Sequence, residues 1–232
     1  MNQKMFDCSV DTDLLTGMRL AKASLGRTEL AVIPTDTVYG IAANAFSAEA
    51  VASLLLAKGR GRQSPPPVLV SGISQAKALV ETFPDAAMKL AETFWPGALT
   101  MIFRSQPSLN WDLGETKQTV ALRVPDHKIA LALLEETGPL AVSSANLTGQ
   151  TAATTCQQAF DYLKDSVQVY LDAGNSPKGE ASTILDMTSL VDSYDAEGKI
   201  TTTGKVRVIR RGALSEAKIR SVIGDLLESN QN

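Results

Sequence analysis

The 232-residue sequence is poor in the side chains that commonly act as nucleophiles or metal ligands, with only two cysteines and one histidine. Cys8 and Cys156 cannot form the disulfide framework of a small secreted protein, nor a cysteine-rich zinc site. The single histidine, His127, excludes a zinc site built on several histidine ligands. Because it follows Pro125 and Asp126, we interpret it as an ordinary surface residue at a helix start, not as a general base.

The sequence also lacks long apolar segments and an excess of positive charge. Apolar runs such as residues 129–134 are far shorter than the roughly 18 residues that span a bilayer. Residues 1–7 lack the apolar core of a signal peptide, so we expect a cytoplasmic protein. The net charge of −3 argues against a DNA-binding domain with a globally basic surface, although it is compatible with a local basic groove.

The sequence does contain enough apolar residues, 44% of the total, for one globular domain of ordinary size. Helical periodicity alternates with short apolar runs, which predicts a single α/β layered domain. Helices are expected at residues 14–25, 47–57, 74–81, 84–94, 126–136, 155–164 and 215–227. Strands are expected at residues 30–33, 68–70, 99–103, 119–124, 140–142, 167–171, 183–185 and 205–209, with a polar hairpin loop at 192–203.

Two glycine-rich segments resemble phosphate-binding motifs but do not fulfil them. Residues 174–179 have the glycine spacing of a phosphate loop, yet Glu180 and Ala181 stand where lysine and a hydroxyl are needed. Gly59 and Gly61 lack the third glycine of a dinucleotide-binding fingerprint and do not follow a strand. These two nucleotide-binding classes are therefore excluded.

Polar segments at predicted strand ends are better candidates, because such positions converge on a ligand crevice in α/β sheets. Residues 34–40 (P-T-D-T-V-Y-G) hold two hydroxyls and a carboxylate, which could equally bond their own backbone in a turn. Residues 58–62 (K-G-R-G-R) place three cations at alternate positions. Such charges match the oxygens of a triphosphate, although most charge runs form solvated loops.

Two further segments carry similar chemistry. Residues 143–146 (S-S-A-N) could hold a ribose, a phosphate or an amino-acid head group, or could cap a helix. Residues 207–212 (R-V-I-R-R-G) supply cations that either close over a nucleotide or face solvent. Ser182 and Thr183 open another strand and add hydroxyls.

Taken in this order, the motifs resemble those of the YrdC-like family, in its short single-domain form. The matching segments are residues 34–40, 58–60, 95–100 (W-P-G-A-L-T), 121–125 (A-L-R-V-P), 144–146, 182–184 (S-T-I) and Arg210. The resemblance implies a catalytic domain at residues 11–214, with a twisted mixed sheet flanked by helices and a concave, positively charged groove. A C-terminal helix and tail would follow at residues 215–232.

The resemblance also implies a reaction, in which L-threonine, bicarbonate and ATP give L-threonylcarbamoyl-AMP, pyrophosphate and water. ATP would be a substrate of this nucleotidyltransferase, and Mg²⁺ would arrive with it. The product would feed a transferase complex that makes threonylcarbamoyladenosine in tRNA, so RNA binding is expected and membrane binding is not. Such phosphoryl-type chemistry depends on positioning and charge neutralisation, which agrees with a chain so poor in cysteine and histidine.

Residue roles follow from the same resemblance. Binding of threonine or its carbamate is implied for Thr35, Arg123, Ser144 and Ser182. Binding of the nucleotide is implied for Lys58, Arg60, Arg62, Thr119, Ser144, Asn146 and Arg210. Lys58 and Arg60 are the catalytic candidates, and Lys58→Ala is expected to abolish most turnover with little loss of stability. Residues 95–97 are expected to form a rigid turn with a buried aromatic ring.

The chain departs from the family pattern in two places. Ala152 and Ala153 stand where many relatives have a Ser-Pro pair, so a contact made by that serine side chain is in doubt. Ser143 stands where relatives often have proline. One alternative is a carbamoyl-adenylate-forming enzyme, but such chains carry an acylphosphatase-like domain and cysteine-rich zinc motifs. Another is a module that binds double-stranded RNA or tRNA, which predicts salt-sensitive affinity without turnover.

Overall fold

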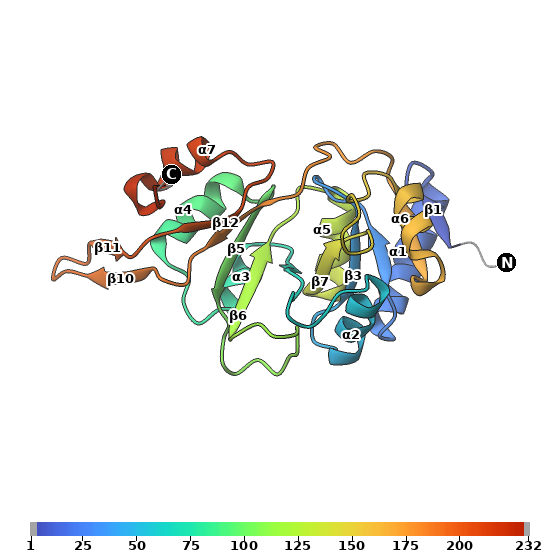
Figure 1. Cartoon of the computed structure of the whole chain (residues 1–232), viewed down its shortest axis with the longest axis horizontal. Helices are drawn as coiled ribbons and strands as arrows, with labels where there is room; N and C mark the ends of the chain where they lie inside the picture. Colours follow the sequence, from blue (N-terminus) through green and yellow to red (C-terminus); the bar gives the residue numbers. More distant parts are fainter. Residues whose placement is uncertain (1–3, 230–232) are drawn as a thin grey trace.

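The computed structural model describes residues 4–229 as one large twisted sheet with helices packed on it (Figure 1). Ten strands form this sheet: β1 (Met5–Asp7), β2 (Ala31–Ile33), β3 (Gly40–Asn44), β4 (Val68–Leu69), β5 (Leu99–Arg104), β6 (Thr119–Arg123), β7 (Leu140–Ser144), β8 (Val169–Asp172), β9 (Thr183–Asp186) and β12 (Arg207–Arg210). The helices are α1 (Asp11–Gly26), α2 (Ala48–Ala57), α3 (Ile73–Ala78), α4 (Asp85–Phe94), α5 (Lys128–Thr137), α6 (Cys156–Leu163) and α7 (Glu216–Ile223), with short 3₁₀ turns at Lys164–Ser166 and Gly224–Leu226.

The sheet is mixed, as predicted, with the strand order β1-β8-β2-β3-β7-β4-β6-β5-β9-β12. Strand β8 pairs in parallel with β1 and β2, β4 with β6, and β5 with β9, whereas the other neighbours are antiparallel. The two-residue strand β4 joins a first half (β1 to β7) to a second half (β6 to β12). Strands distant in sequence therefore become neighbours, and their ends supply the site.

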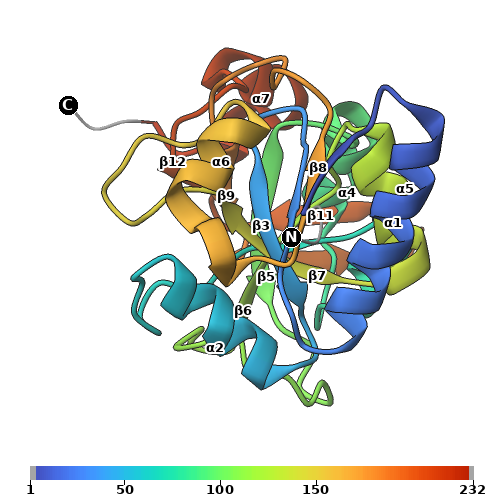
Figure 2. The same ribbon diagram turned by 90° about the vertical axis from the view of Figure 1, so that its right-hand side faces the viewer.

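Helices cover both faces of the first half, because its strands are apolar on both sides (Figure 2). Helices α1 and α5 bury residues such as Leu25 and Leu133 in one core cluster. Helices α2 and α6 bury residues such as Leu54 and Ala159 in a second cluster, which continues beneath α4 and α7. This two-sided burial is typical of layered α/β domains.

Most predicted elements are confirmed within a few residues. Ser47 caps α2, since its Oγ accepts a hydrogen bond from the Ala50 N–H at 3.2 Å. The prediction missed β3 because small residues buried on both faces show no alternation. It also missed the short β1, and α5 begins at Lys128, two residues later than expected.

The predicted hairpin loop is a true two-stranded hairpin, with β10 (Val191–Tyr194) antiparallel to β11 (Ile200–Thr203). It projects from the end of the molecule near β12 (Figure 1). Helix α7 packs against α4 and contributes Ile219 and Ile223 to the larger core cluster. The division into residues 11–214 and 215–232 stays a prediction, and the last three residues of that tail lie outside the described part.

No helix within residues 4–229 is long and apolar enough to cross a bilayer.

Candidate functional site

A cavity of about 280 Å³ lies along one face of the sheet and is lined by residues from β3 at one end to β12 at the other. We call it the central cavity. Its wall is partly apolar, with residues 65–67, Ile102, Leu113 and Ile184. No acidic residue of the described chain lines it. Its polar lining includes Thr35, Thr37, Arg60, Thr100, Thr119, Arg123, Ser143, Ser144, Ser182 and Arg210.

The loop at residues 34–40 is both a self-bonded turn and a wall of the cavity. The Thr35 hydroxyl donates to the Val38 carbonyl at 2.7 Å and accepts from the Thr37 N–H at 3.2 Å. The Thr37 hydroxyl lies 3.0 Å from that of Thr35, and both side chains are almost fully buried. The residue at the end of the loop, Gly40, is a glycine because a Cβ there would lie 2.5 Å from the Val142 side chain of β7. The loop is therefore held in this conformation by its own hydrogen bonds and by its packing against β7.

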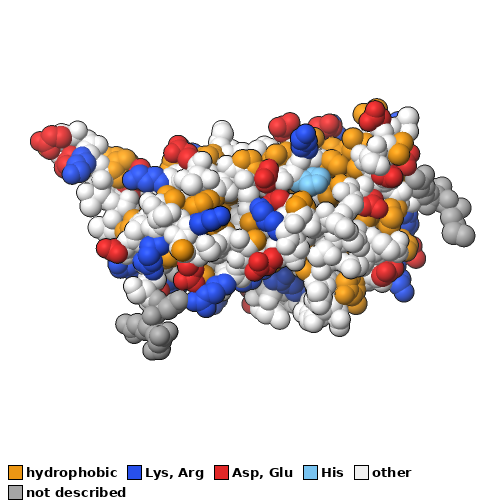
Figure 3. All heavy atoms as spheres, turned by 90° about the horizontal axis from the view of Figure 1, so that it is seen from above, with side chains coloured by type: hydrophobic (Ala, Val, Ile, Leu, Met, Phe, Trp, Pro, Cys, Tyr) orange, Lys and Arg blue, Asp and Glu red, His pale blue; other side chains and the backbone are white. Residues whose placement is uncertain are grey.

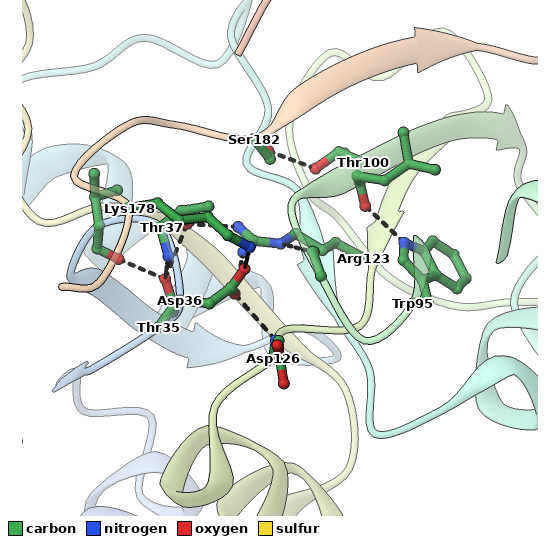
Figure 4. Close-up of polar contacts among 12 residues, drawn as sticks. Thr35, Asp36, Thr37, Trp95, Thr100, Arg123, Asp126, Lys178 and Ser182 are labelled. Atoms are coloured by element: carbon green, nitrogen blue, oxygen red, sulfur yellow. Dashed lines mark hydrogen bonds and ion pairs between the residues drawn. The ribbon is translucent and has the colours of Figure 1, made fainter. Parts of the chain in front are cut away.

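Arg123, from the end of β6, is buried beneath this loop and held on three sides (Figure 4). Its Nε donates to the Gly97 carbonyl at 2.8 Å, and its Nη1 donates to the Thr37 hydroxyl at 2.8 Å. Its Nη2 forms an ion pair with Asp36. Gly97 lies two residues after Trp95, which is buried and whose Nε1 donates to the Leu99 carbonyl at 2.6 Å. The predicted turn with a buried aromatic ring is thus confirmed.

Asp36 is 3% exposed and accepts hydrogen bonds from three directions. Besides Arg123, these come from the Asp126 N–H at 3.0 Å and from Lys178 Nζ at 2.9 Å. Burial favours the neutral acid, but the charge of Arg123 and these hydrogen bonds outweigh it, so the pKa of Asp36 lies below its ordinary value. Asp36 is therefore ionised at neutral pH and orients Arg123.

Lys58 lies just outside the central cavity and is 3% exposed. Its Nζ donates to the Asn146 carbonyl at 2.6 Å and to the Ser144 carbonyl. Burial, followed by the positive charge of Arg60, lowers the pKa of Lys58 to about 8. The side chain thus supports the loop at residues 144–146 in addition to any contact with a ligand.

Arg60 and Arg210 both line the cavity, and neither makes an ion pair within residues 4–229. Arg60 Nη1 donates to the Ser143 hydroxyl at 3.0 Å. Arg210 donates from Nε and Nη2 to the Ser182 carbonyl at 3.1 and 2.8 Å. Desolvation, then the charge of Arg60, lowers the pKa of Arg210, but an arginine remains protonated at neutral pH.

The structure also places the remaining predicted site residues. Ser144, Ser182 and Thr119 line the cavity. Asn146 is buried beside it, and its Oδ1 has no hydrogen-bond donor in the described chain. Arg62 does not line the cavity but forms an exposed ion pair with an acidic neighbour, Asp112, at 2.8 Å.

Sequence reasoning missed several contacts that build the site. Thr100 places its hydroxyl 2.8 Å from that of Ser182. Ser143, which lies in the candidate segment at residues 143–146, accepts a hydrogen bond from Arg60. Lys178 lies in the segment that failed the phosphate-loop test. A run of three prolines at residues 65–67 was a visible signal for a rigid wall, but the other contacts join residues far apart in sequence.

His127 differs from the ordinary surface residue that was expected. It reaches the surface in Figure 3, yet its Nδ1 is buried and has no partner in the described chain. Burial, opposed by Asp36 and Asp126, lowers its pKa from the ordinary value. The residue is the N-cap of α5, so the predicted helix start is confirmed to within two residues.

The fold and the cavity together define an α/β protein suited to a small anionic ligand, with arginines and hydroxyls in place and no acid in the wall. A family model for Sua5, YciO and YrdC proteins, described as telomere recombination, matches residues 24–196. The chain belongs to this Sua5/YciO/YrdC family.

Relatives with names cover most of the chain. It is 46% identical over 224 residues to a protein of Mycobacterium leprae (strain TN) that is provisionally named threonylcarbamoyl-AMP synthase, covering 97% of this chain and 95% of that one. It is 36% identical to the threonylcarbamoyl-AMP synthase of Bacillus subtilis (strain 168), covering 89% and 56%. The crystal structure of P. abyssi Sua5 complexed with L-threonine superposes with a TM-score of 0.83 at 28% identity, covering 97% of this chain and 62% of that one. The chain thus spans less than two thirds of the Sua5 structure.

Proposed function

We propose that this protein is a nucleotidyltransferase that forms L-threonylcarbamoyl-AMP and pyrophosphate from L-threonine, bicarbonate and ATP. The observation that carries the proposal is the central cavity, where three arginines and several hydroxyls meet without an acidic side chain. The names of the relatives and the threonine-bound Sua5 structure support the same activity.

The amino-acid end of the reaction suits the buried side of the cavity. We assign the threonine carboxylate to Arg123, whose orientation is fixed by three hydrogen bonds. Thr35, Ser144 and Ser182 offer hydroxyls for the threonine side chain and the carbamate. The amine adds to bicarbonate with loss of water, and a carbamate oxygen then attacks the α-phosphorus as pyrophosphate leaves.

The nucleotide end suits the cations that lack an acidic partner. We assign the ATP phosphates to Arg60, Arg210 and Lys58, which would neutralise charge as the α-phosphorus is attacked. Asn146, whose buried Oδ1 has no donor in the described chain, is assigned to the nucleotide beside these cations. Ser144 and Thr119 are assigned secondary contacts with the nucleotide, and Arg62 remains a candidate only for the outer phosphate.

The described residues hold no cluster of three or more histidine, cysteine or acidic side chains that fits a protein-bound metal ion. Mg²⁺ would therefore arrive with ATP, held by phosphates and water. We further propose that the protein acts in the cytoplasm, passes its product to a tRNA-modifying transferase complex and binds RNA near the cavity.

The test is to incubate the protein with ATP, labelled bicarbonate and L-threonine and to follow pyrophosphate. We expect release that depends on threonine, with label in a threonylcarbamoyl-adenylate. Release that depends on carbamoyl phosphate instead would support a carbamoyl-adenylate-forming enzyme. Absence of release together with tight, salt-sensitive RNA binding would support the RNA-binding module.

A further inference from the structure

The connection between β8 and β9, residues 173–182, has no role in the proposed reaction apart from Ser182 at its end. It leaves the first half of the sheet and reaches the second half beside the central cavity (Figure 1). At its start, the Tyr39 hydroxyl accepts from the Ala173 N–H at 3.0 Å and donates to the Gly174 carbonyl at 2.7 Å. The connection is thereby tied to the loop at residues 34–40.

Lys178 makes a second tie to that loop, in the middle of the connection. Its main-chain N–H donates to the Asp36 carbonyl at 3.3 Å, and its Nζ donates to Asp36 Oδ2 at 2.9 Å (Figure 4). Gly174 and Gly179 on either side have φ angles of +77° and +64°. Glycine adopts this conformation without strain, so the glycine spacing is explained by this path of the backbone and needs no phosphate.

The ion pair has an electrostatic consequence for the cavity. Asp36 is needed to orient Arg123, but on its own it cancels the charge that Arg123 offers to an anion. Lys178 offsets the charge of Asp36, so the three groups together carry one positive charge. The other titratable groups that act on them are Asp126, which is exposed, His127, and Arg210, whose positive charge also reaches Arg123.

Arg123 keeps N–H donors that can bind an anion in the cavity. A guanidinium has five N–H groups, and the structure assigns one contact each to Nε, Nη1 and Nη2. Each terminal nitrogen therefore keeps one N–H, and Arg123 lines the cavity. Two donors on one planar group match the two oxygens of a carboxylate.

We propose that Lys178 is a positioning and charge-balancing residue that sets the affinity of the central cavity for the carboxylate of its amino-acid substrate. It acts through Asp36 on Arg123 and does not touch the substrate itself. The inference rests on the proposed function, since it assumes an amino-acid carboxylate at Arg123.

The test compares Lys178→Met with Lys178→Arg in the full chain. The matched control is Lys199→Met, which removes an exposed lysine of the β10–β11 hairpin that forms no ion pair within the described residues. Threonine affinity is measured by calorimetry without ATP, and KM for threonine and for ATP by pyrophosphate release. Lys178→Met is expected to weaken threonine binding about fivefold, with the KM for ATP changed less than about twofold. Lys178→Arg should restore most of the affinity, and Lys199→Met should match the wild type.

Each other outcome is decisive. Unchanged threonine affinity in Lys178→Met would overturn the inference and leave the proposed function intact. Equal losses for threonine and ATP, or no rescue by arginine, would show that Lys178 only stabilises the connection, which also overturns it. A wild-type protein that binds no threonine would overturn the proposed function and this inference together.

Discussion

Two groups of cations meet at the central cavity, and they are held in opposite ways. Arg123 is paired with the buried acid Asp36 and is fixed by hydrogen bonds on three sides. Within residues 4–229, Arg60 and Arg210 bond only to hydroxyls and a carbonyl, and the charge of Arg60 acts on Arg210. The first group contains its own acidic partner, whereas the second has none within the described residues.

This difference indicates what each group is built to do. A buried ion pair brings little net stability, but it fixes the orientation of its members. Cations placed together without an acid repel one another, and an anionic ligand relieves that repulsion. Arg123 is thus arranged for a defined geometry with a small carboxylate, and Arg60 and Arg210 for the dense charge of a polyphosphate.

Removing the acid of the first group should have the largest effect. Asp36→Asn leaves Arg123 buried without its counter-ion, so we expect a loss of about 3–5 kcal/mol in the free energy of unfolding. Chemical denaturation measures it, and Asp112→Asn, at an exposed ion pair, is the control with an expected change below about 0.5 kcal/mol. Equal effects of the two substitutions would contradict the comparison.

The same variant gives a signed pH dependence. The pKa of Asp36 is lowered on folding, so its ionised form stabilises the protein above the ordinary aspartate pKa of about 3.9. This contribution is lost as the pH falls through the lower, folded-state pKa. The stability difference between wild type and Asp36→Asn should therefore be constant from about pH 5 to 8 and shrink below about pH 4. A difference that grows in acid would contradict the assignment.

Lys58→Ala tests a cation that differs from both groups, because Lys58 is held by two backbone carbonyls. We expect turnover to fall by about 10²–10³, as for loss of one donor to a transition state. The sequence predicted little loss of stability, but in the structure two carbonyls would lose the Lys58 donor. We therefore expect the free energy of unfolding to fall by about 1–3 kcal/mol. Pyrophosphate release and denaturation measure the two effects, and full turnover in a folded variant would remove Lys58 from the reaction.

Arg60→Met and Arg210→Met should separate affinity from stability. We expect each to raise the KM for ATP about tenfold while the melting temperature stays the same or rises, because repulsion between the two charges is relieved. Arg123→Met is the comparison, and it should lower the melting temperature. If the three variants were equally destabilised, the distinction between the two groups would fail.

Arg62→Ala should have the smallest effect. Arg62 forms an exposed ion pair with Asp112 and does not line the cavity. We expect the KM for ATP to change less than about twofold and the free energy of unfolding by less than about 0.5 kcal/mol. Kinetics and denaturation under the same conditions provide the measurement. A tenfold rise in KM would return Arg62 to the phosphate site.

The sequence predicted local structure well where a local signal exists. The cap at Ser47 and the turn around Trp95 depend on neighbouring residues, and both are confirmed. Strand β3 was missed because small residues buried on both faces carry no periodic pattern. Spacing alone also suggested that all three cations of residues 58–62 face one ligand, whereas only Arg60 lines the cavity.

The amino-acid sequence by itself determined the α/β class, most of the helices and strands, and a motif order that is typical of one family. Only the tertiary structure decided which polar groups meet. Asp36 bonds to Arg123, 87 residues away, and to Lys178, 142 residues away, because the strand order places their loops together. The physical reason is that helix and turn signals are local in the chain, whereas the partner of a buried charge is chosen by the path of the sheet.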